Sequence, residues 1–205
     1  MSSDNDKPPS FPTAEEAARS AKSDLLTVLR TQKHINLGLD ETAVEKSAPG
    51  KPIKHYQISF DELATADATI FGKARNEIAT VVPLVADNKV VTIVGVGKGE
   101  SGWSVASIVD KGISDDLNLL WGINQNAAQG SVNIYDLPHS SVRIYAVSTA
   151  GASGEAGAVT FYTNYPGLNM QEGVGAERIL PVLQHDAAEF QRKHADEIAK
   201  QTLVH

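Results

Sequence analysis

The sequence of 205 residues contains no cysteine. Disulfides, thiolate zinc sites, iron–sulfur clusters and cysteine nucleophiles are therefore excluded. No apolar run reaches about 18 residues, so no membrane-spanning helix is predicted. The 18 lysines and arginines are outnumbered by 25 aspartates and glutamates, which gives a net charge of −7. Because the basic residues form no cluster, neither nucleic acid nor an anionic membrane surface is an expected partner.

The stretch from residue 80 to residue 109 indicates how the chain folds. It contains three β-branched runs separated by turn signals at Asp87-Asn88 and Gly97–Gly102. This pattern is typical of three antiparallel strands joined by hairpins. Pro83 removes one amide donor from the first run, which predicts an edge position or a bulge there. Four further strands are expected over residues 53–60, 132–137, 142–148 and 158–163.

Helical spacing of apolar residues appears near both ends of the chain. Thr13 and Glu16 match a capping box, and a long helix is expected to continue to about Gly38. Residues 40–51 are predicted to form a loop, and residues 164–175 a surface loop. The remaining helices are expected at three places: a short one beginning at Ser59, one over 113–129 capped by Ser114, and one starting near Glu177–Pro181.

Together these patterns predict one fold. Apolar residues make up 41% of the chain, which suits a globular domain. We expect an α+β fold in which a mainly antiparallel sheet of about seven strands packs with long N- and C-terminal helices and one middle helix. Residues 13–205 are predicted to form a single domain. Residues 1–12 are polar and contain proline, and they are predicted to be a disordered tether.

The segment Gly97–Gly102 reads G-x-G-x-x-G, which is also the fingerprint of a dinucleotide-binding loop. In that fold the glycines open a helix whose amides hold pyrophosphate. Here the residues that follow, Trp103–Val109, alternate as in a strand. The favoured interpretation is a glycine-rich hairpin, and no cofactor is predicted.

Candidate metal and acid–base residues have ordinary structural explanations. His185 and Glu189 are four residues apart on the C-terminal helix, but two ligands make no secure zinc site, so no metal is predicted. His194 falls on the apolar face of that helix and is expected to be half-buried. Three aspartates gather near the start of the middle helix: Asp110, Asp115 and Asp116. The positive end of the helix dipole explains the adjacent pair.

Aromatic residues concentrate in the C-terminal third of the chain, and core packing explains most of them. Tyr162 and Tyr165 flank a stretch with Asn164 and Pro166. Tyrosine contributes contact area at a low entropic cost, so these two side chains are the candidate binding residues of an exposed recognition surface. No catalytic residue is identified.

Short segments give the chain a resemblance to uncharacterised exported or lipoprotein-like bacterial domains. The segments are Leu29-Arg30, Asn36-Leu37-Gly38-Leu39-Asp40, Gly50-Lys51-Pro52-Ile53, Val82-Pro83-Leu84-Val85, Asp87-Asn88, Gly102-Trp103 and the proline-started helix after Gly173. The resemblance implies a cystatin-like or PepSY-like sheet wrapped on a helix. It supplies no catalytic residues, and a fold alone does not establish a function.

We therefore expect a non-enzymatic bacterial domain that binds a protein or another envelope macromolecule. The N-terminus lacks an apolar signal core, and its polar start is typical of a tether behind a removed export signal. A periplasmic, cell-surface or secreted location is expected, with the cytoplasm as the alternative. Two other functions stay open. One is a structural or assembly subunit, and the other is a hydrolase that uses histidine and carboxylate side chains such as His139, His185, Asp110 and Glu189.

Overall fold

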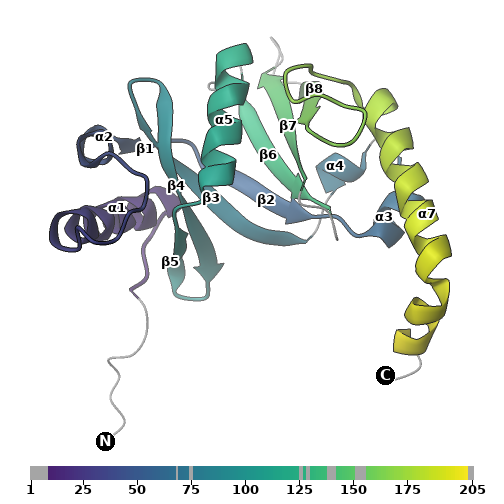
Figure 1. The fold of residues 1–205 in the computed structure, drawn as a ribbon, viewed down its shortest axis with the longest axis horizontal. Helices are drawn as coiled ribbons and strands as arrows, with labels where there is room; N and C mark the ends of the chain where they lie inside the picture. Colours follow the sequence, from purple (N-terminus) through teal and green to yellow (C-terminus); the bar gives the residue numbers. More distant parts are fainter. Residues whose placement is uncertain are drawn as a thin grey trace, which may run out of the picture. The chain divides into compact units, whose positions relative to one another are not determined.

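The computed structural model describes residues 9–67, 69–73, 76–124, 127, 130–137, 142–150 and 156–202. Within these residues the chain has eight strands with mainly antiparallel pairing and long helices at both ends (Figure 1). The predicted α+β class is confirmed. The chain divides into two compact units, Met1–Lys54 with Ala79–Asn124 and His55–Ile78 with Gln125–His205, and each is described by itself. The predicted single domain over 13–205 stays a prediction.

The first unit is built on three consecutive antiparallel strands: β3 (Glu77–Ala86), β4 (Lys89–Gly99) and β5 (Gly102–Ile108). Asp87 and Asn88 have φ values of 51° and 61°, as a two-residue type I′ turn requires. The G-x-G-x-x-G segment forms the second hairpin, in which Gly99 pairs with Gly102. The prediction of a hairpin there is confirmed. The β3–β4 register shifts directly after Leu84, close to the bulge predicted at Pro83.

Helix α1 (Ala14–Thr31) packs against β4 and β5. The Thr13 hydroxyl accepts the amide proton of Glu16 at 3.1 Å, which confirms the predicted cap. Three alanines on the packed face are fully buried, and their small side chains let the helix approach the strands closely: Ala17, Ala18 and Ala21. The helix ends at Thr31 and not near Gly38, because the five residues after Leu29, residues 30–34, are all polar and do not continue the apolar stripe.

Residues 40–51 were expected to be a loop, but they contain α2 (Glu41–Lys46) and a two-residue strand, β1 (Ala48–Pro49). The Asp40 carboxylate caps α2 by accepting the Ala43 amide proton at 2.7 Å. This cap supplies the helix start that the prediction missed.

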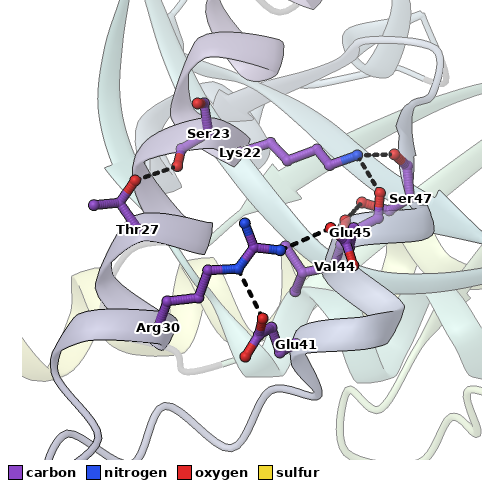
Figure 2. Close-up of polar contacts among 8 residues, drawn as sticks. All are labelled: Lys22, Ser23, Thr27, Arg30, Glu41, Val44, Glu45 and Ser47. Carbon is purple, nitrogen blue, oxygen red and sulfur yellow. Dashed lines mark hydrogen bonds and ion pairs between the residues drawn. The ribbon is translucent and has the colours of Figure 1, made fainter.

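Polar contacts join α1 to α2 (Figure 2). Lys22 Nζ donates to the backbone carbonyl oxygens of Glu45 and Ser47, at 2.8 and 2.5 Å. The Arg30 guanidinium donates to Glu41 Oε1 at 2.8 Å and to Glu45 Oε1 at 2.7 Å. These hydrogen bonds raise the pKa of Arg30. Because the lysine contacts use backbone oxygens, they fix the path of the chain after α2.

Helix α5 (Lys111–Ile123) packs against β4. Its cap is Asp110, whose carboxylate accepts the Ile113 amide proton at 3.0 Å. The prediction of Ser114 as the cap is wrong, because Ser114 lies one turn inside the helix and donates its hydroxyl proton to the Asp110 carbonyl at 2.8 Å. The helix also ends before residue 129.

The second unit contains the end of β2 and three further strands. Their bounds are β2 (Ile53–Gln57), β6 (Ser131–Asp136), β7 (Arg143–Ala150) and β8 (Ala156–Thr163). The four strands expected in these regions are therefore confirmed. β2 ends before residue 60, because Ser59 starts α3 (Phe60–Ala64) with the predicted capping box. The short α4 (Ile70–Lys73) follows.

Helix α7 (Ala176–Thr202) is the last element of the second unit. Pro181 was expected in the first turn but falls in the second, where it leaves the Glu177 carbonyl without its usual amide donor. The preceding segment, 164–175, is not a surface loop throughout. Tyr165, Met170 and Val174 are buried in it, because their side chains add apolar area to the core.

Part of the predicted tether pairs with strand β5. Phe11 donates its amide proton to the Trp103 carbonyl at 2.7 Å and accepts the Trp103 amide proton at 2.8 Å. Gly102 makes this approach possible, because a Cβ there would lie 2.7 Å from the Phe11 carbonyl oxygen and because its φ is +128°. Residues 1–8 of the tether lie outside the described residues.

We expect Gly102→Ala to detach Phe11 from β5 at a local cost of about 1–3 kcal/mol, since alanine rarely adopts that φ. Amide hydrogen exchange should show faster exchange at Phe11 and Trp103. Gly97→Ala is the control, because no atom lies within 4 Å of a Cβ at that position. Unchanged protection of Phe11 in Gly102→Ala would contradict the prediction.

Candidate functional site

A pocket lies on one face of β6, β7 and β8. The strand register places Asn133 opposite Ala146, and Ala146 opposite Phe161. Directly paired residues point to the same face of a sheet, and every second residue along a strand returns to that face. Among the described residues, the strand side chains that line the pocket are Asn133, Tyr135, Ala146, Ser148, Val159 and Phe161.

Two segments complete the walls of this pocket. Thr69, Phe71 and Gly72 come from the region of α4, and Gly175–Glu177 from the start of α7. The pocket volume is about 650 Å³, within the range of small-molecule sites. Several lining residues have small side chains or none, which leaves space beside the larger side chains: Gly72, Ala146, Ser148, Gly175 and Ala176.

The base of the pocket is an aromatic cluster. The Phe71 ring lies 5.3 Å from the Tyr135 ring, edge to face, and 4.4 Å from the Phe161 ring. All three residues are at most 5% exposed. The Tyr135 hydroxyl donates a hydrogen bond to the Phe71 carbonyl oxygen, so the phenol is held in place at the pocket wall.

The environment of Tyr135 keeps its phenol neutral. Burial raises the pKa of Tyr135 to about 12, the nearby Tyr56 adds to the effect, and a hydrogen bond with Asn133 opposes it. The Tyr56 ring stacks on the Tyr135 ring at 5.4 Å. The pocket base therefore carries no charge at any physiological pH.

The rim of the pocket is polar. Thr69, Asn133, Ser148 and Glu177 line it, and among the described residues Glu177 is the only lining residue with a charged side chain. A Cβ at Gly175 would lie 2.2 Å from both carboxylate oxygens of Glu177, so the carboxylate rests directly on the glycine backbone. Sequence analysis missed these residues.

The two tyrosines predicted as a recognition surface are not exposed. Tyr162 is 8% and Tyr165 is 7% exposed, so the expectation of exposure is wrong. The Tyr165 hydroxyl donates to Asp186 Oδ2 at 2.6 Å, and burial together with this hydrogen bond raises its pKa. Their side chains are drawn inward because the following segment folds back over β8. Binding by either tyrosine stays a prediction.

His185 and Glu189 come together with Asp186 on α7, and their ligand atoms lie within 4.8 Å of one another. His185 and Glu189 also line a shallow hollow beside Arg192. Each carboxylate already has a partner: Asp186 accepts from Tyr165, and Glu189 Oε1 lies 2.8 Å from Lys193 Nζ. The hydrogen bond to Lys193 lowers the pKa of Glu189, which makes it a weaker base.

The other candidate residues have structural roles or lie outside the described residues. Asp110 caps α5, and Asp115 pairs with Lys111 at 2.7 Å. His194 is half-buried with its ring 4.5 Å from that of Phe190, as predicted. His139 lies outside the described residues, so the hydrolase interpretation stays a prediction.

Sequence analysis also missed a charged cluster around Asp136. His55 is 7% exposed, and its Nε2 lies 2.9 Å from Asp136 Oδ2, yet the geometry forms no hydrogen bond. Arg143 Nε lies 3.6 Å from the other oxygen of Asp136. Asp136 and Arg143 face each other across the β6–β7 pair, so the strand register explains their contact.

Comparison of the chain with protein-family models, curated proteins and solved structures gives no significant match. The resemblance to exported bacterial domains therefore stays a prediction.

The phenols of Tyr135 and Tyr165 are expected to ionise above the ordinary tyrosine pKa of about 10. A pKa raised by folding stabilises the protein below the unfolded pKa, and this stability is lost as the pH rises through the folded pKa. We therefore expect the free energy of unfolding to fall from about pH 10 to about pH 12.

Urea unfolding and tyrosinate absorbance across this pH range would test the expectation. Tyr135→Phe should show a smaller loss of stability in alkali than the unmodified chain. An equal loss in both proteins, or complete tyrosine ionisation by about pH 10, would contradict it.

Proposed function

We propose that this chain is a non-enzymatic binding protein and that the pocket on β6, β7 and β8 receives an apolar group of its ligand. The pocket itself supports the proposal most directly. Its base is a buried aromatic cluster, its rim is polar, and its volume is about 650 Å³. Ligand sites commonly combine an apolar interior with a few polar groups that fix orientation.

The expected partner, a protein or another envelope macromolecule, remains part of this proposal. The pocket would take one group that such a partner presents. Among the described residues, no helix has both the length and the hydropathy to cross a membrane. The periplasmic, cell-surface or secreted location expected from sequence stays a prediction.

A substitution that fills the pocket should abolish binding of an apolar probe. Ser148→Phe places a ring among the lining residues, and Val159→Trp does so from a side chain that is 40% exposed. We expect each variant to lower the affinity for the neutral dye N-phenylnaphthylamine at least about tenfold, because the ring occupies the probe's volume. Dye fluorescence measures the affinity.

Ser104→Phe provides the matched control, because Ser104 lies on β5 opposite Gly97 and outside the pocket. Thermal unfolding would establish that all three variants fold. Dye binding that survives both pocket-filling substitutions in folded protein would overturn the proposal, as would the failure of the unmodified chain to bind the dye.

A further inference from the structure

The charge at the rim of the pocket is negative. Glu177 is the only residue with a charged side chain among the described residues that line it, and no lysine, arginine or histidine is among them. The neighbouring Arg178 pairs with Glu172, with its Nη1 3.3 Å from Glu172 Oε1. No lysine or arginine in the described part of the chain forms an ion pair with Glu177.

Glu177 lies at the start of α7. It is the second residue of α7, where the partial positive charge of the helix start stabilises a carboxylate. Gly175 leaves the space in which that carboxylate rests. The same carboxylate disfavours an anionic ligand at this helix end, because a second negative charge would be repelled.

The aromatic base adds a second observation. Its rings supply apolar area for the body of a ligand, and they bring no cationic side chain that would compete for the Glu177 carboxylate. Phe71, Tyr135 and Phe161 supply these rings at the base, and the Tyr135 hydroxyl is already committed to the Phe71 carbonyl.

From this arrangement, and resting on the proposed function, we infer that the ligand group is an organic cation: an apolar body that fills the aromatic base and an ammonium group that contacts the Glu177 carboxylate. The cation would carry no bulky anionic substituent near its charged end. The ligand class follows from charge complementarity at one named side chain, whereas the proposed function needs only the apolar volume.

Three naphthyl probes of similar size test the sign of the charge. Naphthylethylamine is cationic, naphthylethanol is neutral and naphthylpropionate is anionic at neutral pH. We expect the amine to bind most tightly and the anion least tightly. Glu177→Gln should lower the amine affinity about two- to fivefold, toward that of the alcohol, because Glu177 is exposed and its ion pair is screened by water.

Two further variants separate charge from position. Glu100→Gln removes one negative charge in the turn between β4 and β5, outside the pocket, and we expect it to leave the amine preference unchanged. Gly175→Ala keeps Glu177 but displaces its carboxylate, so we expect the amine preference to fall. Raising the ionic strength should weaken amine binding and leave alcohol binding unchanged.

The outcomes distinguish this inference from the proposed function. Equal affinity for all three probes, or equal effects of Glu177→Gln and Glu100→Gln, would overturn the cation preference while the pocket still binds. Failure of all three probes to bind would instead overturn the proposed function. A short peptide with lysine beside an aromatic residue tests whether the cation comes from a partner protein or from a small molecule. Tighter binding of the peptide than of naphthylethylamine supports a partner protein. Tighter binding of the amine supports a small molecule.

Discussion

The pairing register of β6, β7 and β8 determines which side chains meet on the pocket face. Ala146 is the central member of one row, with Asn133 on one side and Phe161 on the other. Because side chains alternate between faces, a slip of one residue in β7 would bring Tyr145 or Val147 into that row, depending on its direction. Either of these larger side chains would fill the hollow. The pocket thus depends more on the hydrogen-bond register of these strands than on any single residue.

A hollow of this size runs against the usual density of protein interiors. Atoms that line an unfilled space lose van der Waals partners, so a chain selected for stability alone would place larger side chains there. Here the same face combines fully packed positions such as Ile144 with small ones such as Ala146 and Ser148. Departures of this kind from close packing are expected where a protein needs the space for a ligand.

Local chemistry explains which parts of the fold could be read from sequence. The Asp87-Asn88 turn, the cap at Thr13 and the capping box at Ser59 all depend on residues within a few positions of one another. Each was predictable for that reason. The end of α1 was not predictable in this way, because an N-terminal cap does not determine which apolar residue of the helix is the last to be buried.

The candidate site could not be read from sequence, because its residues come from segments far apart along the chain. Phe71, Ala146 and Glu177 meet only after three strands have paired and the start of α7 has come to the edge of the pocket. The aromatic concentration near Tyr162 and Tyr165 was visible, but both side chains point inward. Their burial depends on how residues 164–175 fold back over β8, and no local pattern encodes that path.

The overall charge of the protein cannot by itself select a cation. The net charge of −7 is spread along the chain, and at physiological salt it is screened over about 8 Å. It would raise the encounter rate of any cation without discriminating among them. Selection requires a carboxylate at the rim of an apolar pocket, where the ligand body is already desolvated. Glu177 meets that requirement, while its exposure keeps the electrostatic contribution modest. Under the proposed function, affinity would therefore come mainly from the aromatic base, and the carboxylate would decide which of several apolar groups is retained.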